Sequence, residues 1–122
     1  MKTVLVVDDS RIMRNVVKSV FSDLKIPSEF LEAENGKRAF HILETNKVDI
    51  IFLDWNMPEM DGIEFLKNVR VIPDYKDLPV VMVTSEAAKY NVVEALQNGA
   101  TDYIIKPIQA KAFKEKISEI AF

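Results

Sequence analysis

The sequence predicts an α/β domain of the doubly wound (βα)5 type, in which helices cover both faces of a five-stranded parallel sheet. Short apolar runs rich in β-branched residues alternate with segments whose apolar residues recur at helical spacing. Continuous apolar runs are typical of parallel strands buried on both faces, and their alternation with helices favours a parallel sheet. A length of 122 residues suits one domain, so we expect residues 1–122 to form a single domain.

Five runs account for the predicted strands. The strongly apolar ones are residues 4–7, 50–53, 80–83 and 103–105, and we interpret them as central strands buried on both faces of the sheet. Residues 29–33 form a weaker run, which supplies the remaining strand.

Five helices are predicted from apolar residues that fall on one face of each segment. Their apolar positions are Ile12, Val16, Val17 and Val20; Ala39, Ile42 and Leu43; Ile63, Leu66 and Val69; Val92, Val93, Ala95 and Leu96; and Ala112, Phe113, Ile117 and Ile120. Gly99 follows the fourth of these segments, and we expect it to end that helix as a C-terminal cap.

The composition argues against several classes of protein. The 16 basic and 19 acidic residues are interspersed and give a net charge of −3, which offers no cationic surface for nucleic acid. The absence of cysteine rules out disulfides and thiolate metal sites. No apolar stretch approaches the roughly 20 residues of a membrane helix, and the first apolar run is too short for a signal peptide. We therefore expect a cytoplasmic protein that binds neither nucleic acid nor membrane.

Polar residues follow the ends of four predicted strands. They are Asp8 and Asp9 after the first strand, Asp54 after the third, Thr84 and Ser85 after the fourth, and Lys106 and Pro107 after the fifth. Ligands of open parallel sheets bind outside the carboxyl ends of the strands. We therefore expect three carboxylates, a hydroxyl and an ammonium group to converge at one edge of the sheet.

This set of groups is suited to phosphate chemistry. Three carboxylates repel one another unless a cation lies among them, and oxygen ligands without His or Cys point to Mg²⁺ or Mn²⁺. Mg²⁺ usually keeps several waters and accepts a phosphoryl oxygen. Lys106 can pair with the resting carboxylate and then with a phosphoryl oxygen, to which Thr84 can donate a hydrogen bond.

Each of these residues alone also has an ordinary structural interpretation. Asp8 and Asp9 could cap the helix that begins near Ser10, and Thr84 could bond to nearby backbone. Lys106 alone could be a solvated strand end. Only the coincidence of polar groups at four strand ends favours a functional site.

Four segments carry a resemblance to a known family. They read Val-Val-Asp-Asp-Ser at 6–10, Leu-Asp-Trp-Asn-Met-Pro-Glu-Met-Asp-Gly at 53–62, Val-Thr-Ser-Glu-Ala at 83–87, and Asp-Tyr-Ile-Ile-Lys-Pro at 102–107. In this combination and order, the sequence resembles the response-regulator receiver family over essentially its whole length. The resemblance implies a flavodoxin-like topology.

The resemblance also implies roles at the site. Asp54 would be the phosphoacceptor, paired with Lys106. The metal would be Mg²⁺, with Mn²⁺ able to substitute, and its ligands would be Asp9, Asp54 and the Asn56 carbonyl, with Asp8 acting through a metal-bound water. Asn56 and Glu86 would limit access of water. The protein would then be no conventional enzyme, but a phosphoacceptor that assists its own loading from small donors and loses the phosphoryl group slowly.

A conformational switch is implied as well. Thr84 would move toward the phosphoryl group, Tyr103 would turn inward, and the bond between Lys106 and Pro107 would be cis. The output face would lie on the fourth helix, fifth strand and fifth helix, with Ala87, Val92, Leu96, Ile105 and Lys116 on it.

The implied partners are a sensor histidine kinase of the chemotaxis type and a target protein, with a phosphatase as a further candidate. The Trp55-Asn56 and Glu86-Ala87 pairs favour a chemotaxis regulator that acts on the flagellar switch protein, and the alternative is a phosphorelay receiver that passes its phosphate to another histidine protein. The sequence ends soon after the fifth helix, so if this is the natural full length, we expect no effector domain and an output by protein binding. We also expect a monomer.

Two other function classes fit the sequence less well. A nucleotide or flavin module would need glycines after the first strand, where this chain has two carboxylates. A phosphatase with an aspartyl nucleophile would need a second aspartate two residues after the first, whereas Asp8 and Asp9 are adjacent.

Further residues have more than one interpretation. His41 is expected to be a surface residue, and Trp55 a residue at the rim of the site rather than in the core. Arg11, Arg14 and Lys18 form a basic stripe, which is either a solvated face or part of a docking surface for an acidic kinase domain.

Overall fold

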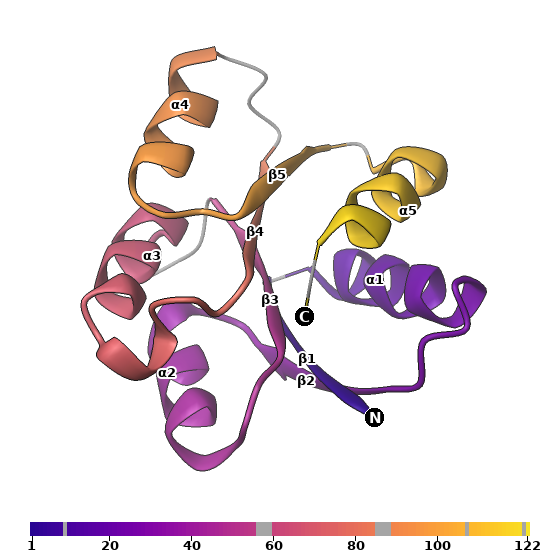
Figure 1. The fold of residues 1–122 in the computed structure, drawn as a ribbon, viewed down its shortest axis with the longest axis horizontal. Coiled ribbons are helices and arrows are strands. Elements are labelled where there is room, and N and C mark those ends of the chain that lie inside the picture. Colours follow the sequence, from indigo (N-terminus) through magenta and orange to yellow (C-terminus); the bar gives the residue numbers. More distant parts are fainter. Residues whose placement is uncertain (9, 56–59, 85–88, 107, 121) are drawn as a thin grey trace.

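The computed structural model describes residues 1–8, 10–55, 60–84, 89–106, 108–120 and 122. Within them, one parallel sheet has the strand order β2-β1-β3-β4-β5 (Figure 1). The strands are β1 (Lys2–Val7), β2 (Ser28–Ala33), β3 (Ile50–Asp54), β4 (Val80–Thr84) and β5 (Asp102–Ile105). The predicted five-stranded α/β fold is confirmed.

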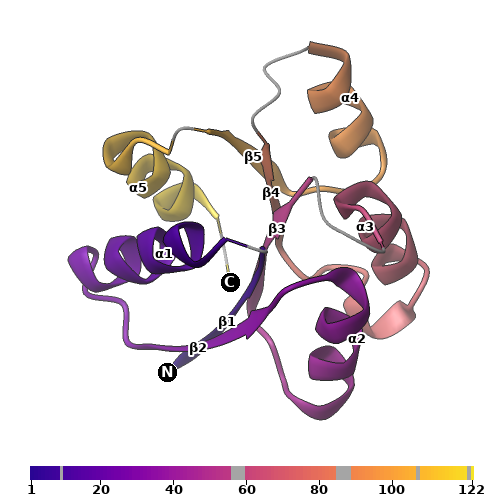
Figure 2. The same cartoon turned by 180° about the vertical axis from the view of Figure 1, so that it is seen from behind.

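The helices cover both faces of the sheet, as predicted. They are α1 (Arg11–Asp23), α2 (Gly36–Thr45), α3 (Gly62–Arg70), α4 (Lys89–Gln97) and α5 (Ala110–Glu119), with a short 3-10 helix, η1 (Pro73–Tyr75). In Figures 1 and 2, α1 and α5 lie on one face, and α2, α3 and α4 on the other. Each face has its own cluster of buried apolar side chains. None of the described helices is long and apolar enough to cross a membrane.

The prediction that residues 103–105 form a central strand was wrong. In the sheet order, β5 is an edge strand next to β4. Tyr103 is consequently half-buried, and Ile105 is 39% exposed. An apolar run indicates a strand, but the pairing of strands decides whether it lies at the centre or at the edge.

One of the apolar residues that marked α1 lies on the surface. Ile12 is 77% exposed, whereas Met13, Val17 and Val20 are buried. Successive helical residues lie about 100° apart, so a helix that turns Met13 inward directs Ile12 away from the sheet. Ser10 caps this helix by accepting a hydrogen bond from the Met13 N–H at 3.4 Å.

The apolar residues of α4 and α5 also divide between core and surface. Ala95 is buried, whereas Val93 and Leu96 of α4 and Ala112 of α5 are exposed. The helices that these three residues marked are present, and exposure of Leu96 agrees with its predicted place on the output face. The helices present part of their apolar surface to solvent.

The predicted cap at Gly99 is confirmed. Gly99 has φ +100°, in the region that favours glycine. Its N–H donates to the Leu96 carbonyl at 3.1 Å, and the Ala100 N–H donates to the Ala95 carbonyl at 3.0 Å. This pair of bonds is the Schellman arrangement that ends a helix.

Candidate functional site

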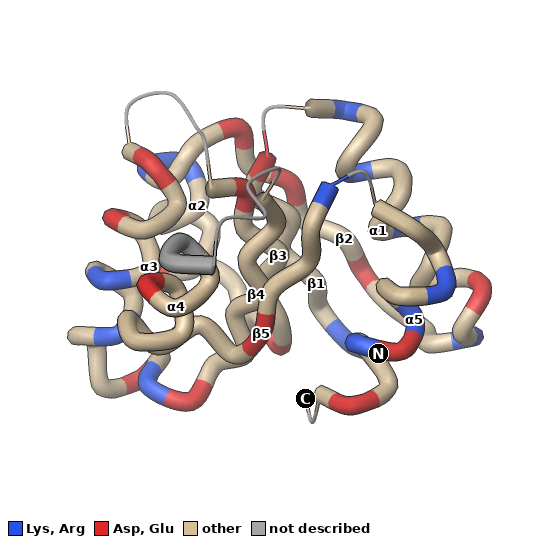
Figure 3. Tube along the Cα trace, turned by 90° about the horizontal axis from the view of Figure 1, so that it is seen from above, with Lys and Arg blue, Asp and Glu red and all other residues tan. Residues whose placement is uncertain are grey.

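Three polar side chains are buried at neighbouring strand ends. Asp8, directly after β1, is 1% exposed, Asp54 at the end of β3 is 5% exposed, and Thr84 at the end of β4 is 2% exposed. The order of the sheet makes β1, β3 and β4 consecutive, so the three groups lie along one edge. In Figure 3, acidic and basic segments meet at this edge, while charges of both signs are interspersed elsewhere.

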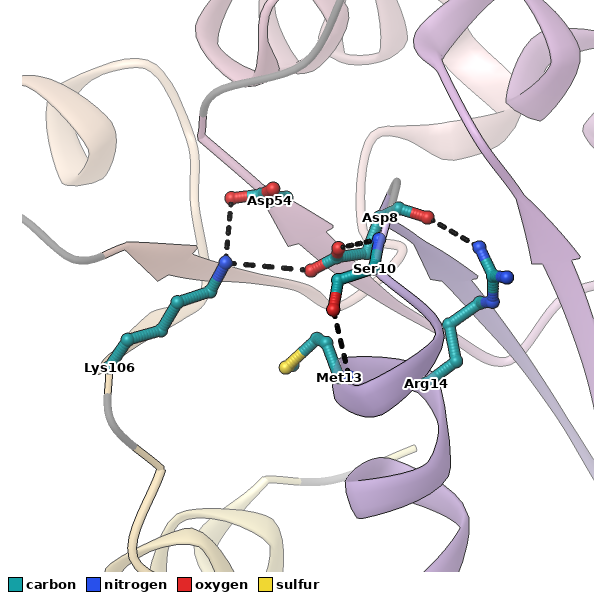
Figure 4. Close-up of polar contacts among 6 residues, drawn as sticks. All are labelled: Asp8, Ser10, Met13, Arg14, Asp54 and Lys106. Atoms are coloured by element: carbon teal, nitrogen blue, oxygen red, sulfur yellow. Dashed lines mark hydrogen bonds and ion pairs between the residues drawn. The ribbon is translucent and has the colours of Figure 1, made fainter.

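Lys106 completes the predicted group from the end of β5. Its Nζ lies 3.3 Å from Asp54 Oδ1, with which it forms a hydrogen bond, and 3.7 Å from Asp8 Oδ2 (Figure 4). The Lys106 backbone N–H donates to the Thr84 carbonyl at 2.8 Å, which fixes the start of the side chain beside β4. The long side chain then reaches past β4 to the aspartate of β3.

The charges of this cluster suit a divalent cation. Asp8 and Asp54 face a single ammonium group, so these three groups carry a formal charge of −1, and Asp9 would add another negative charge. Buried carboxylates require compensating charge, and a donor set made only of oxygen atoms suits Mg²⁺ or Mn²⁺. Among the described residues, no three metal-ligating side chains gather. Two of the four predicted ligands, Asp9 and the Asn56 carbonyl, lie outside those residues.

Local hydrogen bonds orient Asp8. Its Oδ1 accepts the Ser10 N–H at 2.6 Å, and its backbone carbonyl accepts Arg14 Nη1 at 2.8 Å (Figure 4). The helix cap is Ser10 itself, so the interpretation of Asp8 as the cap of α1 was wrong. One carboxylate oxygen of Asp8 is used locally, and the other faces Lys106.

The basic stripe on α1 contacts β2. Lys18 Nζ lies 2.7 Å from Glu32 Oε1, and Arg14 Nε lies 3.7 Å from Glu32 Oε2. The hydrogen bond from Lys18 lowers the pKa of Glu32, against a smaller opposing effect of burial, and the charges of Lys18, Arg14 and Arg11 lower it further. Two of the three basic residues are therefore engaged within the chain, whereas Arg11 is exposed.

Gly62, the first residue of α3, allows the helix to approach the site closely. Its N–H donates to the Trp55 carbonyl at 2.8 Å. A Cβ at this position would collide with the Asp54 backbone oxygen and lie 2.9 Å from the Trp55 Cα. The end of β3, which carries Asp54, is thus packed directly against the start of α3.

The predicted output residues that the structure describes lie on the three predicted elements. Val92 is half-buried and Leu96 exposed on α4, Ile105 is exposed on β5, and Lys116 is half-buried on α5. A groove of about 380 Å³ follows β5 and α5, lined by Tyr103, Ile104, Ile105, Lys106, Gln109, Ala112 and Lys116. The groove extends from the site lysine to Lys116.

Several predictions concern positions that the structure leaves undescribed. Asp9, Asn56, Glu86 and Ala87 lie outside the described residues, and so does Pro107. Metal ligation by Asp9 and Asn56, control of water by Asn56 and Glu86, and the cis bond before Pro107 all stay predictions.

His41 and Trp55 fall into different environments. His41 is exposed, as predicted. Trp55 is half-buried and packs against the apolar cluster on the α2, α3 and α4 face, so it combines a core contact with a position beside Asp54.

Sequence reasoning missed two polar contacts. The bond from Arg14 to the Asp8 carbonyl and the ion pair between Asp102 and Lys116 at 2.9 Å were not predicted. The basic stripe drew attention to Arg14, but no spacing rule connects it with a backbone carbonyl. Asp102 and Lys116 lie on different elements, so only the packing of α5 against β5 brings them together.

Comparison with known proteins identifies the family. Residues 4–118 match the response regulator receiver domain. The chain belongs to this family. It is 43% identical to a chemotaxis protein CheY homolog of Campylobacter jejuni over 117 residues, which are 95% of this chain and 89% of that protein.

Solved receiver structures share the fold. The structure of the chemotaxis protein CheY4 of Vibrio cholerae superposes with a TM-score of 0.88 at 32% identity, and the match covers 99% of each chain. The Mn²⁺-bound form of the response regulator Rcp1 superposes with a TM-score of 0.83 at 26% identity, covering 96% of this receiver and 89% of that chain. The flavodoxin-like, CheY-type fold is thereby confirmed.

Proposed function

We propose that residues 1–122 form one receiver domain, which takes up a phosphoryl group on Asp54 and signals by binding another protein. The observation that carries this proposal is the buried Asp54 carboxylate at the end of a central strand, with Lys106 Nζ 3.3 Å from its Oδ1. A carboxylate in this position is a nucleophile with a cation beside it.

The transfer requires no protein base. A carboxylate oxygen of Asp54 attacks the phosphorus atom of a phosphohistidine, an O–P bond forms, and the P–N bond breaks as the imidazole leaves with the electron pair. With a small acyl phosphate, the P–O bond to the acyl group breaks instead, and the carboxylate leaves. Lys106 pairs with a phosphoryl oxygen as charge shifts during the transfer, and catalysis consists mainly of such electrostatic stabilisation.

A divalent cation is part of the proposal. Asp8, Asp9, Asp54 and the Asn56 carbonyl would hold Mg²⁺, with Mn²⁺ able to replace it, and Asp8 would act through a water. When bound, the cation would offset the carboxylate charges and stabilise the phosphoryl oxygens. The cluster of buried carboxylates around one ammonium group supports this assignment, and the related response regulator Rcp1 has a Mn²⁺-bound form.

The signal would leave the site through Thr84 and Tyr103. Thr84 is buried at the end of β4, and Tyr103 pairs in register with Met82 of the same strand. When Thr84 moves to donate a hydrogen bond to the phosphoryl group, it would vacate space into which the Tyr103 ring can turn. The face formed by α4, β5 and α5 would change with it, and a partner helix could bind there by its apolar side.

The partners we propose are a sensor histidine kinase as donor and the flagellar switch protein as target. The similarity to chemotaxis proteins of the CheY type over nearly the whole chain supports the chemotaxis role. A phosphorelay would differ in a measurable way, because the phosphoryl group would then move on from Asp54 to a second histidine protein.

Acetyl phosphate with Mg²⁺ provides the test of the site. Intact-protein mass spectrometry should show one added phosphoryl group, and Asp54→Asn should abolish it. Lys106→Met should slow loading by about 100-fold, the effect of removing one charge-stabilising donor. Lys67→Met, at an exposed lysine in the last turn of α3, is the matched control and should load normally. If Asp54→Asn still acquired a phosphoryl group on another carboxylate, Asp54 would not be the phosphoacceptor.

A further inference from the structure

A second polar cluster lies where β5 meets α5. Asp102 Oδ1 accepts a hydrogen bond from the Tyr103 backbone N–H at 2.8 Å and lies 2.9 Å from Lys116 Nζ. The same Nζ lies 4.4 Å from the centroid of the Tyr103 ring. One carboxylate oxygen thus binds the backbone of Tyr103 and a lysine that lies over its side chain.

The contact between the ammonium group and the ring is attractive. A cation within about 6 Å of an aromatic centroid is drawn to the face of the ring. The side chains of Asp102 and Lys116 are only 22% and 31% exposed, so solvent screens the cluster less than it would a fully exposed pair. Because Asp102 is bonded to the backbone of Tyr103, the ammonium group stays with the strand when the ring turns.

We propose that Lys116, tethered by Asp102, is a positioning residue that holds the Tyr103 ring at the edge of the sheet and opposes its inward rotation. The inference rests on the proposed function, because the movement of Tyr103 regulates the output only if phosphorylation of Asp54 drives it. Asp102 and Lys116 would set how much phosphorylation is needed before the output face changes.

The position of the Tyr103 ring indicates in which direction Lys116 shifts the equilibrium between the outer and inward positions of the ring. Tyr103 is half-buried beside the apolar cluster of the α2, α3 and α4 face, and it lines the groove that Lys116 also lines. A ring that turns further into the protein leaves the ammonium group behind. Loss of that attraction adds to the free-energy cost of turning, so removal of the ammonium group should favour the inward position by about 2- to 5-fold.

Fluorine NMR of protein labelled with 3-fluorotyrosine can measure this shift. The chain has three tyrosines, and Tyr103→Phe identifies the signal of interest. During titration with beryllofluoride, the Tyr103 signal of Lys116→Met should reach half-conversion at a concentration about 2- to 5-fold lower than in the unmutated protein. Lys116→Arg should restore the original midpoint, because guanidinium keeps the charge and stacks on aromatic rings.

Two variants separate this role from simple packing. Asp102→Asn removes the charge that holds the ammonium group but keeps an acceptor for the Tyr103 N–H, so its midpoint should shift in the same direction as that of Lys116→Met. Lys111→Met changes an exposed lysine of the same helix and should leave the midpoint unchanged. A pair that only ties α5 to β5 would lower the free energy of unfolding in Lys116→Met without moving the midpoint, and that result would overturn the proposal.

The experiment also distinguishes failure of the proposed function. If the unmutated protein did not bind beryllofluoride, the assignment of the phosphoacceptor site would fail. The fluorine signal of Tyr103 in the unloaded proteins would still differ between Lys116→Met and the unmutated chain, and return in Lys116→Arg. An identical Tyr103 signal in all three unloaded proteins would refute the positioning role.

Discussion

Replacing Gly62 with alanine tests whether close packing of α3 against β3 sets the position of Asp54. The added Cβ would collide with the Asp54 backbone oxygen and lie 2.9 Å from the Trp55 Cα. Both atoms belong to the main chain, so a rotamer change cannot relieve the collision. Either the start of α3 or the end of β3 must move.

The cost of this substitution follows from overpacking. Extra carbon in a well-packed region typically costs about 1 to 3 kcal/mol. Alanine is better than glycine by about 1 kcal/mol inside a helix, but Gly62 is the first residue of α3, so this gain should be small. We expect a loss of about 1 to 3 kcal/mol in the free energy of unfolding, which lowers Tm by roughly 4 °C per kcal/mol.

Urea unfolding and beryllofluoride binding together measure the effect. Gly36→Ala is the matched control, because both glycines begin a helix directly after the capping residue, which is Asn35 for Gly36 and Asp61 for Gly62. A Cβ at position 36 would lie 2.9 Å from the Met60 Sδ and 3.2 Å from its Cβ and Cγ. The flexible thioether can move aside, and the two 3.2 Å contacts involve a side chain rather than the main chain, so they need only a small shift of Met60. We expect Gly36→Ala to lose less than about 1 kcal/mol and to bind beryllofluoride normally, whereas Gly62→Ala should bind it more weakly.

Unchanged stability together with unchanged binding in Gly62→Ala would refute this role of the α3 contact. If Gly62→Ala were as stable as the unmutated protein and bound beryllofluoride equally well, the contact between α3 and the end of β3 would not control Asp54. A loss of stability with unchanged binding would show that the strain relaxes through the helix and leaves the strand in place.

Three further predictions concern the metal, the ion pair on β2 and the output. Binding of Mg²⁺ should change the fluorescence of Trp55, the single tryptophan. Asp54→Ala should weaken Mg²⁺ binding by about tenfold or more, and an equal Mg²⁺ affinity in the variant and the unmutated protein would argue against the site. Glu32→Gln should cost about 0.2 to 1 kcal/mol at neutral pH, since the pair with Lys18 is partly exposed. The folded-state pKa of Glu32 is lowered, so the stability difference between Glu32→Gln and the unmutated protein should be present above the ordinary glutamate pKa. It should vanish as pH falls through the lowered pKa, and a stability difference that persisted in acid would contradict this prediction. Tyr103→Ala should leave phosphoryl loading nearly intact but weaken phosphorylation-dependent binding of a target peptide. If the unmutated protein bound the peptide equally well with and without the phosphoryl group, this output mechanism would be ruled out.

Local patterns in the sequence determined the elements and the candidate site. Apolar runs marked the strands, and Gly99 marked the end of α4, because a positive φ and a Schellman arrangement depend on a few consecutive residues. The prediction that Asp8, Asp54 and Lys106 would meet required only parallel strands, whose carboxyl ends share one edge. The structure brings these three groups together.

The tertiary structure decided what depends on pairing and orientation. Periodicity does not encode the order of strands, so β5 was taken for a central strand although it lies at the edge. A rotation of about 100° per residue separates core from surface on a helix, so Ile12 is exposed while Met13 beside it is buried, although both are apolar. Such choices are made by the whole sheet and its helices.

Contacts between distant elements were beyond any local pattern. Asp102 and Lys116 belong to a strand and a helix, and their ion pair depends on where α5 packs against β5. Arg14 reaches the Asp8 carbonyl only because α1 starts close to the end of β1. The sequence by itself therefore determined which chemical groups this protein brings to the edge of its sheet. The packing of helices on strands decided which neighbours hold those groups in place, because such contacts join residues whose separation along the chain carries no periodic signal.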